Sequence, residues 1–161
     1  MTRDRMLASI ATLGPIGQLP APGTMGSLAA LVVGVCITIN GGLGMLVIAT
    51  LAVSIIGLSA AGAHFRETGI KDSGAVVIDE VAGQWLVLLA IPFRPDLTPI
   101  YLISVATAFG LFRFFDIIKI GPVKMAEELP GAAGVMADDV VAGAMAGGVL
   151  IMIVAILGWA L

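Results

Sequence analysis

The chain has 161 residues, 59% of them hydrophobic and 12% charged, with a formal net charge of −3 and a mean hydropathy of +1.10. This composition excludes an ordinary soluble protein and indicates a single membrane-embedded domain covering 1–161. The scattered lysines and arginines argue against a nucleic-acid partner, the lone Cys36 excludes a disulfide framework, and nothing in the sequence implies a protein partner.

The N-terminal segment, 1–21, is expected to lie at the membrane interface. Arg3 and Arg5 precede a short apolar stretch that Gly14 and Pro15 end, which is typical of an interfacial segment. A cleaved signal peptide is the alternative, although the apolar stretch is short for one.

Five apolar stretches follow, at 27–39, 43–63, 76–91, 99–118 and 139–161, with breaks at 40–42, 67–74, 92–99 and 121–134. At about 1.5 Å per residue, the second, fourth and fifth stretches can cross a hydrocarbon core of about 30 Å. The first and third are short. The pattern therefore predicts an all-α integral membrane bundle of four to five helices.

The cations predict how this bundle is oriented. If the N-terminus is cytoplasmic and all five stretches cross, only Arg94 lies outside, and the other seven cations lie on the cytoplasmic side: Arg3, Arg5, Arg66, Lys71, Arg113, Lys119 and Lys124. Because successive crossings alternate in direction, the same assumption brings four segments to one face of the membrane: the start of the first stretch, the 64–80 loop, the end of the fourth stretch and the start of the fifth. The predicted location is therefore a multi-pass membrane protein whose charged groups face the cytoplasm.

The segment 22–27 precedes the first apolar stretch and contains two hydroxyl side chains, Thr24 and Ser27. Together with free backbone N–H groups at a helix start, these hydroxyls could bind an anion. An ordinary helix cap at either residue is the equally plain interpretation.

Five carboxylates lie at the edges of the apolar stretches: Asp79, Glu80, Asp116, Asp138 and Asp139. A carboxylate at the bilayer centre costs about 2.5 to 3.5 kcal/mol, so such groups are expected to be paired, bound to metal or near the interface. The two adjacent pairs are each expected to open a helix, where the helix dipole tolerates anions, and this alone would explain either pair.

If the five acids meet, they face only Arg113 and Lys119, and a divalent cation would offset the excess charge. Oxygen ligands without a His or Cys set favour Mg²⁺ or Mn²⁺, and the candidate ligands are Asp79, Glu80, Asp138 and Asp139.

Arg113, Asp116 and Lys119 follow one another at helical spacing on the fourth stretch. A simple ion pair at the interface would account for them. The functional hypothesis is a guanidinium fork and an ammonium that bind a phosphate, with Asp116 orienting Arg113 or sharing the metal.

Small residues form a stripe on the fifth stretch, at Ala142, Gly143, Ala146 and Gly147, and Gly83 lies one turn after Asp79. Such stripes let helices approach closely, either to bring carboxylates together or simply to pack.

Four motifs occur in order: PGTMGS at 22–27, KDSG at 71–74 leading into VIDEV at 77–81 with Gly83, FRFFDIIK at 112–119, and GVMADD at 134–139 with Ala142 and Gly143. Together they resemble the phosphatidylglycerophosphatase A family of bacterial inner membranes. One departure is visible, since the family usually has proline directly after the lysine, whereas this chain has Ile120-Gly121-Pro122.

The resemblance implies a Mg²⁺-dependent phosphatase that converts phosphatidylglycerophosphate to phosphatidylglycerol at the cytoplasmic face of the inner membrane. The expected catalytic residues are Asp79, Glu80, Arg113, Asp116, Lys119 and Asp139, and the expected phosphate-binding residues are Thr24, Ser27, Arg113 and Lys119. Either Asp139 or Glu80 could position the attacking water, and an aspartyl-phosphate intermediate remains an alternative.

Two further classes of function stay open from the residues alone. Intramembrane acids also mark ion and proton pathways, so a small transporter or channel subunit is the main alternative. A purely structural helix bundle is the other, and it needs no converging charge.

Overall fold

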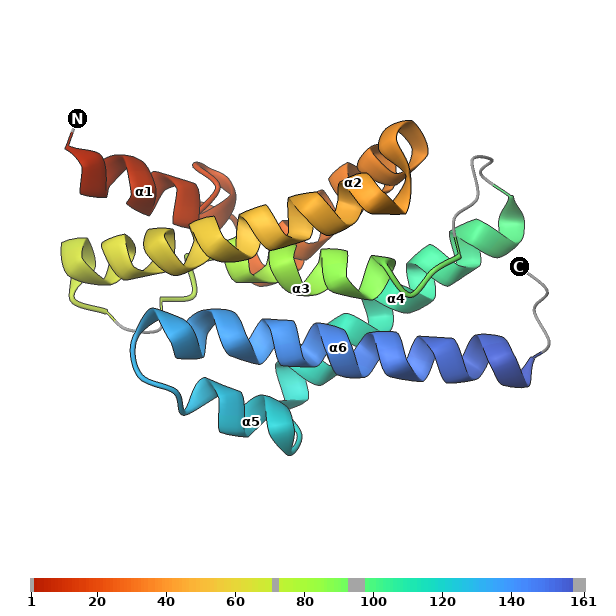
Figure 1. Cartoon of the computed structure of the whole chain (residues 1–161). Helices are drawn as coiled ribbons and strands as arrows, with labels where there is room; N and C mark the ends of the chain where they lie inside the picture. Colours follow the sequence, from red (N-terminus) through yellow and green to blue (C-terminus); the bar gives the residue numbers. More distant parts are fainter. Residues whose placement is uncertain (1, 71–72, 93–97, 158–161) are drawn as a thin grey trace.

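The structure, a computed structural model, describes residues 2–70, 73–92 and 98–157 (Figure 1). Within these ranges the regular elements are all helical, as predicted. They are α1 (Arg3–Ala11), a short 3₁₀ turn (Ile16–Gln18), α2 (Pro22–Thr68), α3 (Ile78–Leu88), α4 (Pro99–Ile118), α5 (Pro122–Glu127) and α6 (Ala132–Ile156). Helices α2, α4 and α6 are long and apolar enough to cross a membrane, which supports the predicted membrane bundle.

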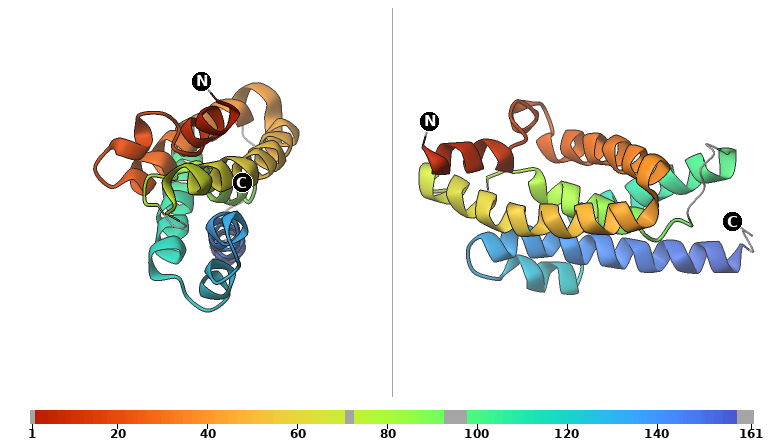
Figure 2. Two further views of the ribbon diagram at one scale, coloured as in Figure 1. Left: turned by 90° about the vertical axis from the view of Figure 1, so that its left-hand side faces the viewer. Right: turned by 45° about the horizontal axis from the view of Figure 1, so that its top comes forward.

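Helix α2 is interrupted at Gly42, where the chain reverses direction. Gly42 has φ 71° and ψ −179°, a conformation that only glycine adopts readily, and it falls in the predicted break at 40–42. Both figures of the whole chain show the arms before and after this residue running in opposite directions (Figures 1 and 2). As a result, Pro22 and Thr68 lie toward the same end of the bundle.

Helix α3 lies at the centre of the bundle, where it packs against α2, α4 and α6. The indole of Trp85 donates a 2.8 Å hydrogen bond to the Ala30 carbonyl of α2, and Phe112 of α4 is fully buried next to Gly83 of α3 in the same core. With 11 residues, α3 is only about 16 Å long, which is about half the hydrocarbon core. The third stretch is therefore short, as predicted, and α3 alone does not cross.

A close backbone contact joins α3 to α6 through two glycines. A Cβ added to Gly143 would lie 2.5 Å from the Gly83 carbonyl oxygen, and a Cβ added to Gly83 would lie 2.5 Å from the Asp139 carbonyl oxygen. The two backbones therefore touch directly, which is the close approach that the small-residue stripe predicted. Because of this contact, the first turn of α3 lies beside the second turn of α6.

Two predicted boundaries are wrong. The break expected at 121–134 contains α5, and α6 begins at Ala132 rather than at residue 139. Asp138 and Asp139 therefore lie inside a helix instead of opening it, because the run from Ala132 to Ala137 is itself helix-forming once Gly131, with φ 62°, has turned the chain.

One further expectation is wrong, and another is not tested at two of its residues. Segment 22–27 is the first turn of α2, whose N-cap is Ala21, so neither Thr24 nor Ser27 caps the helix. Lys71 and Arg94, which the orientation argument used, lie outside the described residues.

Candidate active site

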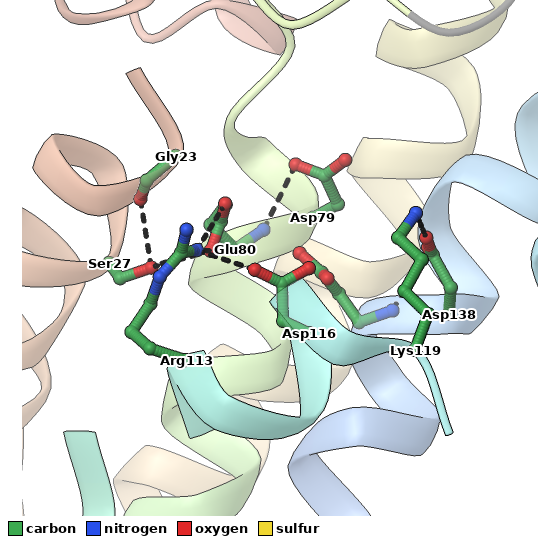
Figure 3. Close-up of polar contacts among 9 residues, drawn as sticks. Gly23, Ser27, Asp79, Glu80, Arg113, Asp116, Lys119 and Asp138 are labelled. Atoms are coloured by element: carbon green, nitrogen blue, oxygen red, sulfur yellow. Dashed lines mark hydrogen bonds and ion pairs between the residues drawn. The ribbon is translucent and has the colours of Figure 1, made fainter. Parts of the chain in front are cut away.

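A pocket of about 270 Å³ lies where the polar ends of α2, α3, α4 and α6 meet (Figure 3). All the predicted site residues but one line it: Thr24, Asp79, Glu80, Arg113, Asp116, Lys119, Asp138 and Asp139. The exception, Ser27, is fully buried next to Glu80. The predicted convergence of charged groups on one end of the bundle is therefore present.

Three carboxylates from three helices form the centre of this pocket. Glu80 of α3, Asp116 of α4 and Asp139 of α6 each offer an oxygen, and these oxygens lie within 4.8 Å of one another. Glu80 and Asp139 are only 7% and 3% exposed. Three ionised carboxylates that are this close together and this shielded from solvent repel one another strongly. The cluster is therefore suited to binding a cation that prefers oxygen ligands.

This cluster overlaps only in part with the metal ligands predicted from the sequence. Glu80 and Asp139 belong to it, and Asp116 joins them. Asp79 and Asp138 line the same pocket but are not members of the trio. From the sequence, Asp116 is predicted only to orient Arg113 or to share the metal.

Arg113 is held by the carboxylates of the trio. Its Nη1 lies 2.5 Å from Glu80 Oε2 and 2.7 Å from Asp116 Oδ2, and its side chain is 15% exposed. The same nitrogen donates to Ser27 Oγ at 3.3 Å, which in turn lies 2.5 Å from Glu80 Oε2. A single guanidinium thus connects α2, α3 and α4 at the pocket.

The first turn of α2 makes room for this arrangement. A Cβ on Gly23 would meet the carboxylate of Glu80 and displace it, so glycine here lets this carboxylate keep its position. Ser27 Oγ also donates a 2.9 Å hydrogen bond to the Gly23 carbonyl, and Thr24 lines the pocket. The PGTMGS motif therefore supports Glu80 directly, a role that its sequence alone did not reveal.

Lys119 ends α4 in the left-handed conformation, with φ 50° and ψ 53°. A non-glycine residue there costs about 1 to 2 kcal/mol. Its Nζ lies 2.6 Å from Glu127 Oε1 and 2.9 Å from Asp138 Oδ2. Burial acts to lower the pKa of Lys119, but the two carboxylates outweigh it and raise this pKa above its usual value, so the side chain stays a cation.

The departure from the family pattern after Lys119 has a structural explanation. Gly121 takes a positive φ of 51° and precedes α5, and Pro122 occupies the first turn of that helix. Proline is favourable there because its missing N–H would have no helical partner. The turn therefore forms without a proline directly after the lysine.

Burial also shifts the acids at the start of α3, a helix too short to cross the membrane. Burial and then the charge of Glu80 raise the pKa of Asp79 well above its usual value. Burial and then the charge of Asp116, partly offset by Arg113, raise the pKa of Glu80 to about 7. Without a cation, these two groups therefore hold protons to unusually high pH.

The sequence pattern of the family described as phosphatidylglycerophosphatase A matches residues 9–154 of this chain. The chain belongs to the phosphatidylglycerophosphatase A family. It is 36% identical over 172 residues to phosphatidylglycerophosphatase A of Haemophilus influenzae, with all of both chains covered. It is 32% identical to phosphatidylglycerophosphatase A of Escherichia coli, covering 82% of this chain and 73% of the relative.

A third relative, from Bacteroides thetaiotaomicron, carries the provisional name phosphatidylinositol-3-phosphatase, with 37% identity over 76% of this chain and 77% of the relative. No solved structure matches the chain. Membership of the phosphatidylglycerophosphatase A family confirms the resemblance found in the motifs and the prediction that the protein is a phosphatase.

Proposed function

We propose that this protein is a Mg²⁺-dependent phosphatase that hydrolyses phosphatidylglycerophosphate to phosphatidylglycerol and phosphate at the cytoplasmic face of a bacterial inner membrane. The observation that carries the proposal is the trio of Glu80, Asp116 and Asp139 with Arg113 bound to it, inside a membrane-type bundle of the phosphatidylglycerophosphatase A family. The names of the Haemophilus influenzae and Escherichia coli relatives supply the lipid.

The donor chemistry of the trio fits a divalent cation. Glu80, Asp116 and Asp139 would hold it, since all their donor atoms are carboxylate oxygens and the pocket holds more acids than cations. Such an ion, when bound, would neutralise charge and polarise a phosphoryl oxygen. Mg²⁺ rather than Mn²⁺ is proposed, because it usually completes its shell with substrate phosphate.

Arg113 and Lys119 would bind the phosphate from opposite sides of the pocket. Arg113 is anchored through one nitrogen, Nη1, to Glu80 and Asp116, and its orientation is fixed before substrate binds. Lys119 is a compact charge at the pocket edge. Donors fixed in advance stabilise the charge that develops on a phosphoryl group during transfer, without reorganising at that moment.

Asp79 is the best candidate to accept the proton of the attacking water. It lines the pocket but lies outside the trio, so its oxygens need not be metal ligands, whereas those of Glu80 and Asp139, the two candidates considered from the sequence, would be ligands. Burial and then the charge of Glu80 raise the pKa of Asp79 above the usual value, which makes the ionised carboxylate a stronger base than a free aspartate. Water oxygen would bond to phosphorus, the bond to the glycerol oxygen would break, and that oxygen would gain a proton from solvent.

The test is phosphate release from phosphatidylglycerophosphate by protein purified in detergent, with Mg²⁺ or with a chelator. Asp139→Asn should lower kcat by about 10²-fold or more, because one buried charge of the trio is lost. Asp4→Asn is the matched control, since Asp4 is an exposed acid whose ion pair with Arg66 lies at the surface, away from the pocket. Chelator-resistant release, or full activity of Asp139→Asn, would contradict the proposal.

The relative from Bacteroides thetaiotaomicron makes the lipid itself a point to test. The same assay with phosphatidylinositol 3-phosphate would show whether the pocket accepts another phospholipid monoester. A tenfold preference for phosphatidylglycerophosphate in kcat/KM would support the proposed substrate, and the reverse preference would reassign it.

The distribution of cations around the pocket supports the proposed orientation. Arg66, Arg113, Lys119 and Lys124 lie on elements that end at the pocket's side of the bundle, and cations favour the cytoplasmic side. Glu128→Cys in a Cys36→Ser background offers one exposed thiol near that end. A membrane-impermeant maleimide should label it in inside-out vesicles and not in intact cells; the opposite result would invert the orientation.

The transporter alternative has no structural feature in its favour among the described residues. The five acids gather at one end of the bundle instead of following a path through its depth. Vesicle ion flux that Asp139→Asn abolishes, with phosphatase activity unchanged, would revive it.

A further inference from the structure

Lys119 lies between two carboxylates that belong to two different helices. Its Nζ is 2.6 Å from Glu127 Oε1 of α5 and 2.9 Å from Asp138 Oδ2 of α6. Asp138 lines the pocket, and Glu127 does not. Glu127 also lies between the last two family motifs and belongs to neither, so neither the motifs nor the expected chemistry gives it a role.

The two carboxylates pull the ammonium in different directions. If Asp138 were its single partner, Lys119 would be drawn toward the acidic centre, where Glu80, Asp116 and Asp139 also attract it. Glu127 is the nearer partner and acts from outside the pocket lining. The observed position of Lys119, at the pocket edge and 28% exposed, is the balance of these attractions.

Glu127 is itself held firmly enough to act as an anchor. Val123 and Ala126 of α5 are buried, and α5 packs against α6. Glu127 is the last residue of this helix, and its side chain is 37% exposed. The backbone on the other side of the contact is also constrained, because Lys119 ends α4 in a defined left-handed conformation.

We propose that Glu127 is a positioning residue that holds the Lys119 ammonium at the edge of the pocket, ready for the substrate's phosphate, and keeps it from closing onto Asp138. The proposal rests on the proposed function for the presence of a phosphate. It does not depend on which lipid carries it, since a free phosphate in the pocket would meet the same ammonium.

The charge of Glu127 allows positioning to be separated from simple electrostatics. Replacing Glu127 by glutamine removes one negative charge near the pocket. Through space alone, this change would strengthen the binding of a phosphate. Loss of positioning would weaken it, because Lys119 would then be free to pair with Asp138 alone. The two explanations therefore predict opposite changes in phosphate affinity for Glu127→Gln.

The experiment compares Glu127→Gln with Glu128→Gln in detergent-purified protein with Mg²⁺. Glu128 is the next residue, it is exposed, and within the described residues no ion pair involves it, so the control removes the same charge at nearly the same place. The measurements are the affinity for inorganic phosphate by calorimetry, KM and kcat for phosphatidylglycerophosphate, and the unfolding temperature.

Glu127→Gln should raise the phosphate Kd and KM about tenfold, less than the 10²-fold typical of a misplaced reacting group, with kcat within about threefold. Glu127→Asp keeps the charge and should recover most of the affinity. Glu128→Gln should change the phosphate Kd and the KM by no more than about twofold. A Glu127→Gln protein with unchanged or tighter phosphate binding would overturn the proposal.

A double substitution tests whether Glu127 acts through Lys119. In a Lys119→Ala background, Glu127→Gln should have no further effect on phosphate affinity, because the residue that it positions is gone. A further loss of tenfold there would refute the proposed route. Wild-type protein that binds phosphate but does not hydrolyse phosphatidylglycerophosphate would contradict the proposed function and leave this test intact.

Discussion

The contact between Gly83 and Gly143 gives a quantitative prediction for Gly143→Ala. The added methyl group would lie 2.5 Å from the Gly83 carbonyl oxygen and 3.0 Å from its Cα, where ordinary contacts begin near 3.4 Å. Both obstacles are backbone atoms of a buried helix, so they cannot rotate away. Helices α3 and α6 must therefore separate by about 1 Å.

This separation acts directly on the pocket, since α3 carries Glu80 and α6 carries Asp139. We expect overpacking to cost about 1 to 3 kcal/mol in stability. A shift of about 1 Å between reacting groups costs on the order of 10²-fold in rate. Gly143→Ala should therefore unfold at a temperature lower by about 2 to 10 °C and lose about 10²-fold in kcat.

The control for this prediction is Gly148→Ala on the same helix. A Cβ at Gly148 would meet nothing within 4 Å, and the position is exposed. Alanine there should stabilise α6 by about 0.5 to 1 kcal/mol and leave activity unchanged. Thermal unfolding and phosphate release are measured on both variants. If Gly143→Ala matches wild type in both, the glycine contact does not set the carboxylate geometry.

Three further predictions concern single groups. The raised pKa of Glu80, about 7, means that its neutral form is favoured, so the metal-free protein should lose stability as pH rises through about 7. Stabilisation by added Mg²⁺ should correspondingly grow from pH 6 to pH 8 in thermal unfolding, and a pH-independent effect would exclude Glu80 as a ligand. Arg113→Lys should lower kcat by about 10²-fold, because a single ammonium that pairs with Glu80 and Asp116 has no second nitrogen to donate to the phosphate; activity within threefold would show that a point charge suffices. Trp85→Phe should cost about 1 to 3 kcal/mol of stability, because the buried hydrogen bond to the Ala30 carbonyl is lost and the smaller ring leaves a cavity, with kcat nearly unchanged. A large loss of kcat in that variant would show that packing around α3 is coupled to the pocket.

The sequence predicted those parts of the fold that depend on local pattern. Apolar length identified the helices, and Asn40-Gly41-Gly42 identified the reversal, because a positive φ favours glycine whatever surrounds it. The stripe at Gly143 predicted a close helix contact. In contrast, the start of α6 was missed, since two adjacent aspartates suggest a helix end even when the helix begins earlier in the chain.

The composition of the acidic trio depends on packing that local pattern does not encode. Asp116 lies in the middle of an apolar helix turn and becomes a member of the cluster only because α3, α4 and α6 meet at one level. Glu127 was missed for a related reason. The glycines and prolines at 121–122 and 130–131 suggested one long break. The structure instead has a helix of six residues, α5, between two turns.

The reversal of α2 at Gly42 also bears on how the chain could enter a membrane during synthesis. From Pro22 to Ala63 there is no charged residue, and the turn between the two arms consists of asparagine, glycine and leucine. Inserting this hairpin as a unit moves no charged group across the hydrocarbon core, and its two polar ends never leave the side on which they were made. The later helices can then assemble against a scaffold that is already in place.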